Sequence, residues 1–281
     1  MQKAALLIIL GIFILTGVVF FIYNEKSPHI IPGSEDVEIL QKWELPAGLE
    51  EVSGIDWLGN NQIAAIQDED GVIFIYDLTS SSIKKEIKFA ETGDYEAIAL
   101  VDETAYVLRS DGTIYEVQNF QSDSFKTIIH SISLEGKFNF EGLGYDESNN
   151  RLLLAIKEKT GNVSKPVYAF NLETKKLIAN PVFEIEYSNP LFSKVGKKPS
   201  ENMLRPSEVT LNKENGNIYL LEAAIPKILI LSPEGKPEKL YLLSDRDFFQ
   251  AEGITFGDSG DVYISNENKR GNGNILKVNL K

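Results

Sequence analysis

The sequence predicts an all-β, five-bladed β-propeller of four-stranded blades, preceded by one transmembrane helix. Three observations lead to this prediction: a motif that recurs about every 45 residues, strand-like runs between its copies, and an unpaired strand-like run before the first copy. Repeats of this length with four strands each are typical of propellers, whose radial blades leave only short protected edges.

The composition fits a large folded domain and excludes several kinds of site. The chain has 281 residues, of which 43% are hydrophobic and 10% aromatic, and this is ample for a buried core. Its formal net charge is −13, so we expect a divalent cation, and not nucleic acid, among its partners. The sequence has no cysteine, which excludes disulfides, thiol nucleophiles and zinc ribbons.

An uncharged apolar run near the amino end predicts a membrane anchor. It extends from Ala4 to Tyr23, and as a helix it would be about 30 Å long, which matches the hydrocarbon core of a bilayer. The run ends in bulky residues and not in the small ones of a cleavage site, so residues 1–24 are predicted to remain as a signal anchor. A buried core helix is disfavoured, because a helix that is apolar all round rarely packs inside a domain at the end of a chain.

The flanking charges and the next residues set the expected topology. Lys3 precedes the apolar run and favours a single-pass, N-in orientation in the cell membrane. Residues 25–36 contain two prolines, a glycine and mixed charges, which is the composition of a linker. We therefore expect the propeller domain, residues 37–281, to lie on the extracytoplasmic, periplasmic side.

The repeat is defined by one position, which is a serine in the first copy and a glutamate in the other four. These positions are Ser53, Glu96, Glu141, Glu208 and Glu252. They are separated by 43, 45, 67 and 44 residues. The long interval contains residues 187–206, which we interpret as an inserted loop. A degenerate sixth blade is the alternative, but roughly 20 residues are too few for four strands of about five residues each.

Each interval holds a succession of short strand-like runs. In the second copy these runs are 96–101, 104–109, 113–118 and 125–130, with Ser-Asp-Gly in the turn at 110–112. The last copy has only three such runs before the sequence reaches Lys281. The run from Val37 to Leu45 has no partner of its own, so it is predicted to complete the last blade and to close the circle of blades.

The predicted fold brings the repeated glutamates together. The first strand of every blade lines the central axis of a propeller, and each glutamate begins a first strand. We therefore expect a ring of carboxylates at one mouth of the channel, formed by Glu96, Glu141, Glu208 and Glu252. Two carboxylates about 7 Å apart at an effective dielectric near 20 repel by about 2 kcal/mol, so the ring needs a cation, shared protons or amide donors.

Two roles remain open for each of the four glutamates. As metal ligands they offer only oxygen, without histidine or cysteine, and this donor set favours a hard cation, Ca²⁺ before Mg²⁺. As structural residues they would accept N–H bonds from the next blade and hold the blades together. We expect Ca²⁺ as the cofactor, with these four side chains as its candidate ligands.

The repeated motifs also resemble a known family. The segments "VSGIDW", "GDYEAIALV", "LRSDGTIYEV", "NFEGLGYD", "RPSEVTL" and "QAEGITF", behind an amino-terminal anchor, are similar to the SdiA-regulated (YjiK-like) family. The resemblance covers residues from about Ile39 to Lys281. It implies a five-bladed propeller related to NHL-repeat propellers, exposed to the periplasm or cell exterior, with a calcium site. Ala97 and Val209 depart from the glycine that follows glutamate in the other two copies.

Three functions are compatible with these features. The first is a membrane-tethered, calcium-binding module that binds an unidentified ligand or protein at the face with the channel mouth. The second is a calcium-dependent phosphoesterase or lactonase, similar to phytase-like propellers, for which only Arg109, Lys157 and Arg205 are candidate phosphate-binding residues. The third is a scaffold without a ligand. The absence of a nucleophile with a base beside it favours the binding module over an enzyme.

Overall fold

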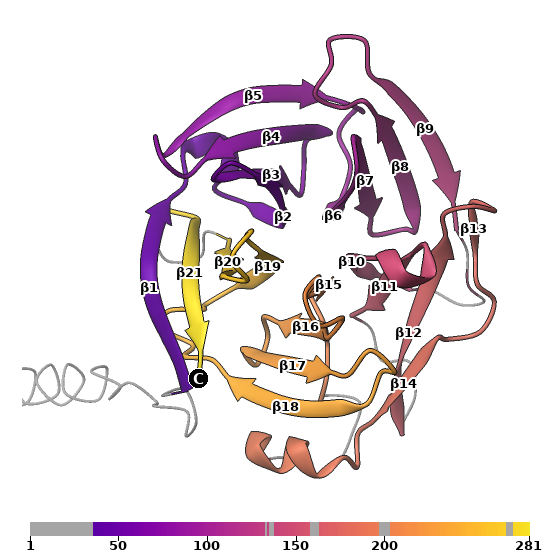
Figure 1. Cartoon of the computed structure of the whole chain (residues 1–281), viewed down its shortest axis with the longest axis vertical. Coiled ribbons are helices and arrows are strands. Elements are labelled where there is room, and N and C mark those ends of the chain that lie inside the picture. The colour runs from indigo at the N-terminus through magenta and orange to yellow at the C-terminus, as the bar shows by residue number, and fades with distance from the viewer. Residues whose placement is uncertain (1–35, 133, 135–137, 158–162, 197–202, 268–271) are drawn as a thin grey trace, which may run out of the picture. The chain divides into compact units, whose positions relative to one another are not determined.

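Five antiparallel sheets surround a central axis in the part of the chain that the structure describes (Figure 1). The computed structural model describes residues 36–281, except 133, 135–137, 158–162, 197–202 and 268–271. The predicted all-β, five-bladed propeller is therefore confirmed, and the described residues contain no sixth sheet.

The blades follow one another along the chain, and the innermost strand of each is its first. Blade one contains β2 (Val52–Gly59), β3 (Gln62–Gln67), β4 (Val72–Asp77) and β5 (Ser82–Lys88). Blade two contains β6 (Tyr95–Val101), β7 (Thr104–Arg109), β8 (Thr113–Gln118) and β9 (Lys126–Ser131). Blade three contains β10 (Phe140–Asp146), β11 (Arg151–Ile156), β12 (Ser164–Asn171), β13 (Lys176–Leu177) and β14 (Phe183–Glu186). Blade four contains β15 (Glu208–Leu211), β16 (Ile218–Glu222), β17 (Lys227–Leu231) and β18 (Pro237–Leu242). Blade five contains β19 (Ala251–Phe256), β20 (Val262–Asn266), β21 (Asn274–Leu280) and β1 (Val37–Glu44).

Two blades carry features outside the simple four-strand pattern. In blade three the outer edge is divided between β13 and β14, which both pair with β12. The predicted insertion before blade four contains a short 3-10 helix, Pro190–Val195, whose first turn is capped by the side chain of Asn189. Two further 3-10 turns, Ala47–Leu49 and Glu147–Asn149, connect strands.

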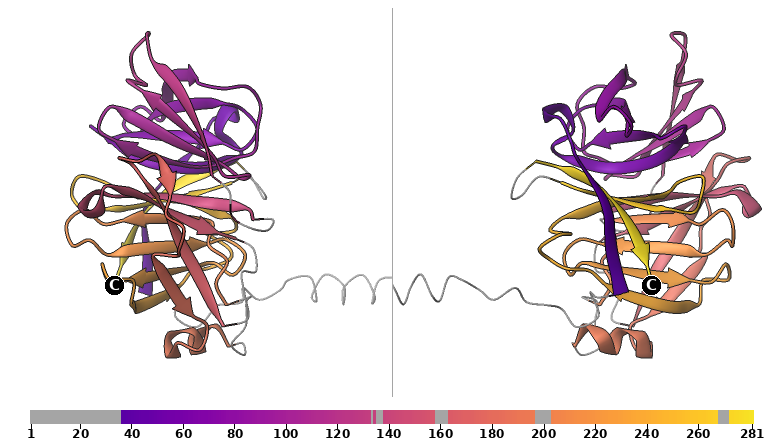
Figure 2. Two further views of the ribbon diagram at one scale, coloured as in Figure 1. Left: turned by 90° about the vertical axis from the view of Figure 1, so that its right-hand side faces the viewer. Right: turned by 60° about the vertical axis from the view of Figure 1, so that its left-hand side comes forward.

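The amino-terminal strand closes the circle of blades, as predicted. β1 pairs antiparallel with β21, with Trp43 opposite Ile275, and the two strands run side by side in the right-hand view of Figure 2. The amide of Lys281 also donates to the carbonyl of Asp36 at 2.9 Å. Because the first and last strands share a sheet, closure joins the two ends of the domain.

Apolar side chains fill the spaces between neighbouring blades. One cluster joins blades five and one and includes Trp43, Ile55 and Tyr263, while others lie between blades one and two, two and three, and four and five. The inner strands contact one another in the order β2, β6, β10, β15, β19 and back to β2. This packing places the starts of the inner strands around one end of the central axis.

The glycines of the repeated motif allow the inner strands to approach closely. A Cβ atom on Gly142 would lie 2.6 Å from the amide nitrogen of Val209 in the next blade. A Cβ on Gly253 would lie 2.9 Å from the Ile55 side chain, and one on Gly54 would lie 2.9 Å from the Cα of Ala97. At each of these contacts one blade has a glycine and the neighbouring blade has a larger residue. Ala97 and Val209 therefore fit in blades two and four, because each packs against a glycine of a neighbouring blade.

The predicted membrane anchor, Ala4–Tyr23, lies outside the described residues. Among the residues that are described, no helix has the length and apolar character needed to cross a bilayer.

Candidate functional site

The structure places all four predicted glutamates at the starts of inner strands, and most of them at irregularities in strand pairing. The pairing register shifts between Tyr95 and Ala97, between Phe140 and Gly142, and between Ala251 and Gly253, each time around the glutamate. Blade one has the same shift around Ser53. A β-bulge changes the direction of the extra residue's side chain. The motif side chains therefore do not follow the regular alternation between the two faces of the sheet.

Glu208 differs from the other three because it is held by backbone amides. Its Oε1 accepts hydrogen bonds from the amide of Leu143 in blade three at 2.7 Å and from that of Val209 at 2.8 Å. The side chain is only 1% exposed. Burial raises its pKa well above the ordinary value, and the carboxylates of Asp56 and Glu252 add to this effect. Glu208 therefore joins two blades, which is the structural role that the sequence left open.

A second carboxylate, that of Asp56, joins blades in the same way and was not predicted from the sequence. Asp56 of β2 accepts the amide of Leu100 in blade two at 2.7 Å and the hydroxyl of Thr255 in blade five at 2.8 Å. Burial raises the pKa of Asp56, and the two donors oppose that rise. The only signal in the sequence is an aspartate within an otherwise apolar first strand.

Replacing Glu208 by glutamine tests its structural role. Because the amide oxygen of glutamine can still accept both backbone N–H groups, Glu208→Gln should change the free energy of unfolding by less than about 1 kcal/mol in urea titrations. Glu208→Leu, which leaves both amides without an acceptor, should cost clearly more. Equal losses in the two variants would contradict the role of Glu208 as a hydrogen-bond acceptor.

Glu141 forms an ion pair across its own blade. Its Oε2 lies 2.8 Å from Nζ of Lys157, the residue that follows β11, and its Oε1 accepts a hydrogen bond from Asn139. Glu141 is 2% exposed. Burial alone would lower the pKa of Lys157, but the carboxylates of Glu141 and Glu252 raise it above the ordinary value. Lys157 was predicted as a candidate phosphate-binding residue, and its pairing with Glu141 was not predicted, because the two residues come from different parts of the blade.

Glu96 is the glutamate whose charge is least compensated. Within the described residues its carboxylate makes no hydrogen bond or ion pair, although the side chain is largely buried. Burial, followed by the charges of Glu141 and Asp94, raises the pKa of Glu96 to about 9, and Lys157 opposes the rise. Glu96 is therefore largely protonated at neutral pH unless a cation lies beside it.

Glu252 completes the group at the channel mouth. It is 9% exposed, and its charge acts on Glu96, Glu208 and Lys157. We refer to Glu96, Glu141, Glu252 and Lys157 as the mouth cluster. The structure thus brings three of the four predicted glutamates together around Lys157. Glu208 is directed instead to the amide of Leu143, which lies further along β10 than Glu141.

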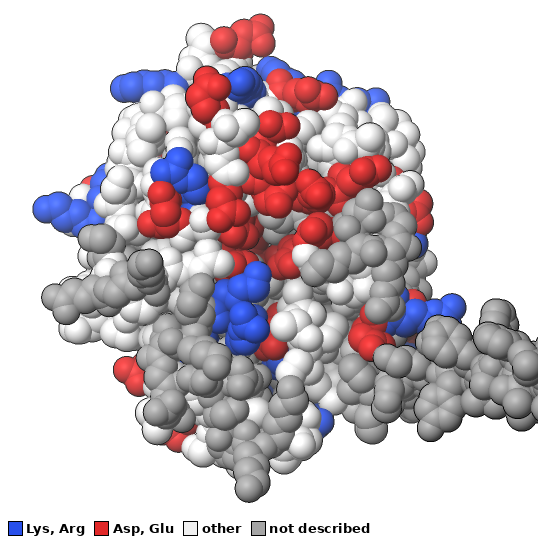
Figure 3. All heavy atoms as spheres, turned by 180° about the vertical axis from the view of Figure 1, so that it is seen from behind, with Lys and Arg blue, Asp and Glu red and all other residues white. Residues whose placement is uncertain are grey.

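The surroundings of the mouth cluster are acidic. Burial raises the pKa of Asp68, and the carboxylates of Glu51, Glu69 and Asp94 raise it further. Figure 3 shows one face of the molecule on which acidic side chains gather toward the middle, with basic side chains beside them. Within the described part of the chain, however, no three histidine, aspartate or glutamate side chains stand close enough to form a ready-made metal site.

The basic residues proposed for phosphate binding are in part engaged elsewhere. The guanidinium of Arg109 is held by Asp111, with Nη2 2.7 Å from Oδ2 and Nε 3.0 Å from Oδ1. Lys157 is paired with Glu141, as described above. Arg205 donates its main-chain amide to Glu222 at 2.8 Å, while its Nε is buried without a hydrogen-bond partner in the described part of the chain. Two of the three candidates are therefore already paired with carboxylates of this chain and give the hydrolase alternative no specific support.

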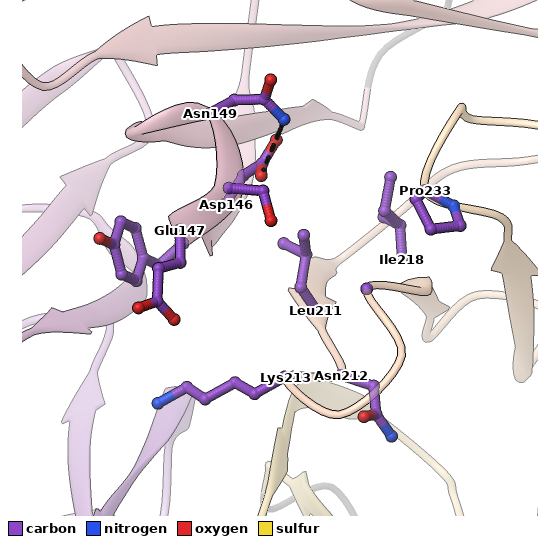
Figure 4. Close-up of a pocket in the computed structure, with 11 residues that line it drawn as sticks. Asp146, Glu147, Asn149, Leu211, Asn212, Lys213, Ile218 and Pro233 are labelled. Atoms are coloured by element: carbon purple, nitrogen blue, oxygen red, sulfur yellow. Dashed lines mark hydrogen bonds between the residues drawn. The ribbon is translucent and has the colours of Figure 1, made fainter.

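A separate cavity lies at the opposite ends of the inner strands (Figure 4). It is bordered by Asp146, the last residue of β10, by Asn149 in the following 3-10 turn, and by Leu211 and Lys213 at the end of β15. The carboxylate of Asp146 accepts hydrogen bonds from Asn149 and is paired with Arg151 at 2.7 Å. None of the four predicted glutamates borders this cavity, so it is not part of the mouth cluster.

Solved structures with a similar fold share little sequence with this chain. A glutaminyl cyclase from Myxococcus xanthus superposes with a TM-score of 0.59 at 13% identity, covering 87% of this chain and 96% of its own. A Bacteroides thetaiotaomicron protein of unknown function gives a TM-score of 0.54 at 17% identity, over 83% of this chain and 57% of its own. A PQQ-bound aldose sugar dehydrogenase from Streptomyces coelicolor gives 0.52 at 11% identity, over 87% and 98%. At such identities the similarity shows the fold alone.

Sequence comparison is more specific than structural comparison for this chain. No curated protein sequence matches it. The profile of the SdiA-regulated family matches residues 82–270, which is more than half of the chain and includes all four glutamates. This chain belongs to the SdiA-regulated family.

Proposed function

We propose that this protein is a binding propeller that holds a divalent cation, Ca²⁺ before Mg²⁺, at the channel mouth and uses that face to bind a ligand or a partner protein. The observation that carries the proposal is the carboxylate of Glu96, which is largely buried beside Glu141 and Glu252 and has no hydrogen-bond or ion-pair partner within the described residues. A cation there would remove the repulsion between these three side chains and would favour the ionised form of Glu96.

The donor atoms of the site suit a hard cation. Glu96, Glu141 and Glu252 offer only carboxylate oxygens, and Ca²⁺ accepts several such ligands in irregular geometry. Glu208 lies next to them, and its Oε2 is buried without a hydrogen-bond partner in the described part of the chain. Binding would require the three carboxylates of the mouth cluster to move closer together, because they do not stand at ligand distances from a common point.

We also propose that the protein acts while tethered to the cell membrane. The apolar run Ala4–Tyr23 and the linker of residues 25–36 precede β1 directly, so the anchor would hold the propeller on the extracytoplasmic side. Protease added to intact spheroplasts should digest the propeller domain and spare a cytoplasmic marker protein. Full protection of the propeller would contradict this orientation.

Calcium binding is tested by calorimetric titration of the full-length chain with CaCl₂. We expect saturable binding that weakens at least about tenfold, or 1.4 kcal/mol, in Glu96→Gln, because the variant loses one anionic oxygen ligand. The matched control is Glu86→Gln, which removes the same charge from the exposed face of β5, far from the inner strands. Binding that weakens equally in both variants would show a general effect of net charge and would contradict a site at Glu96.

A further inference from the structure

Lys157 takes the position in the mouth cluster at which a cation would be expected. Its Nζ lies 2.8 Å from Oε2 of Glu141, and its charge interacts with Glu252 and Glu96 as well. The main-chain amide of Lys157 donates to the carbonyl of Asn139 at 3.2 Å, which fixes the base of the side chain beside β10. The ammonium therefore neutralises one of the three negative charges that the cluster carries when all its carboxylates are ionised.

The side chain of Lys157 can move into water, whereas that of Lys227, another lysine paired with a glutamate, cannot. The side chain of Lys157 is 30% exposed, whereas Lys227, which pairs with Glu222 in blade four, is 0% exposed. A lysine side chain has a flexible four-carbon stem and a strongly hydrated ammonium, so a partly exposed one can move into water at little cost. Glu141 is 2% exposed, so its carboxylate stays buried in the mouth cluster when the lysine moves.

We propose that Lys157 is a built-in counter-ion of the mouth cluster, which occupies the cation position in the free protein and which Ca²⁺ must displace in order to bind. The inference rests on the proposed function, since it concerns the same carboxylates. Two cations on one carboxylate oxygen repel each other, so lysine and calcium exclude one another there. Lys157 thereby sets the affinity of the site without being a metal ligand.

The first test compares the calcium affinity of Lys157→Gln with that of the wild type, in full-length protein titrated with CaCl₂. Glutamine keeps an N–H donor for Glu141 but has no charge to compete with the metal. We expect the Kd to fall at least about tenfold. The matched control is Lys277→Gln, which removes the same charge beside Asp261 at the opposite end of the blade-five strands and should leave the Kd unchanged.

The outcomes separate this inference from the proposed function. Tighter binding by Lys157→Gln alone supports the inference. Unchanged or weaker binding by Lys157→Gln, while the wild type binds Ca²⁺, overturns the inference and leaves the proposed function standing. Binding by the variant but not by the wild type supports the counter-ion role and contradicts the proposed function. No binding by either protein overturns both.

The second test measures the exposure of lysine side chains in the wild-type protein, so it does not depend on whether a variant folds. Acetylation of lysines by an N-hydroxysuccinimide ester, followed by mass spectrometry, reports how exposed each ammonium is. Saturating CaCl₂ should raise the acetylation rate of Lys157 severalfold, because the displaced ammonium enters water, while Lys277 should not change. An unchanged or slower rate at Lys157 would overturn the displacement.

Discussion

Lys227→Met should lower the free energy of unfolding by about 3–5 kcal/mol, because it leaves a buried carboxylate without its counter-charge. Nζ of Lys227 lies 2.5 Å from Oε2 of Glu222, and the two side chains are 0% and 1% exposed. Burial raises the pKa of Glu222, and Lys227 is the main influence that opposes this. For a domain of this size the loss corresponds to a fall in Tm of about 6–20 °C, measurable by thermal or urea unfolding.

The double variant shows whether the lost charge pairing is the cause. Glu222→Gln combined with Lys227→Met removes both charges, so it should recover much of the stability that Lys227→Met loses. Lys84→Met serves as the control, since Lys84 is exposed on β5 and its replacement should cost no more than about 0.5 kcal/mol. A loss below about 1 kcal/mol in Lys227→Met would contradict the assignment of this pair as a stabilising element.

Glu96→Gln should stabilise the metal-free protein relative to the wild type, by an amount that grows by up to about 1.4 kcal/mol for each pH unit above 4.5. The pKa of Glu96 is raised to about 9 in the folded chain, against 4.5 for an ordinary glutamate. The folded state thus keeps a proton that the unfolded state releases above pH 4.5, so the contribution of Glu96 to stability is complete below that pH and declines up to about pH 9. Glutamine resembles the protonated form at every pH and does not suffer this loss.

The measurement is urea unfolding of both proteins in EDTA at pH 5, 7 and 9. The difference between wild type and Glu96→Gln should be small at pH 5 and should grow with pH, and titrating groups far from Glu96 cancel in that difference. Glu86→Gln should show no such trend, since Glu86 lies exposed on an outer part of blade one. A difference that stays constant from pH 5 to pH 9 would show that Glu96 is not held in its protonated form.

The blade architecture was predictable because each blade repeats one pattern. The glutamate at the start of each first strand marks the same point on the axis, so the spacing of Glu96, Glu141, Glu208 and Glu252 predicts where blades begin. The unpaired run before the first blade predicts closure, since a last blade with three strands needs a fourth. Both predictions depend on local sequence alone, and both are confirmed by the sheet topology.

The individual roles of the glutamates were not predictable, because they depend on partners far away in the sequence. Oε1 of Glu208 accepts a hydrogen bond from the amide of Leu143, and a backbone amide leaves no mark in the residue types. Glu141 pairs with Lys157, which follows the neighbouring strand β11 and lies 16 residues away in the sequence. The bulges at the motif positions depend on how two strands are paired, and not on the residues of either strand alone.

The central claim, that the mouth cluster binds a divalent cation, is tested most directly by a crystal structure of the protein in CaCl₂, with calcium located from its anomalous scattering. We predict one ion with carboxylate oxygens of Glu96, Glu141 and Glu252 at about 2.3–2.6 Å, and Nζ of Lys157 moved away from Glu141. A mouth without an ion, in which Lys157 still pairs with Glu141 at saturating calcium, would contradict the claim.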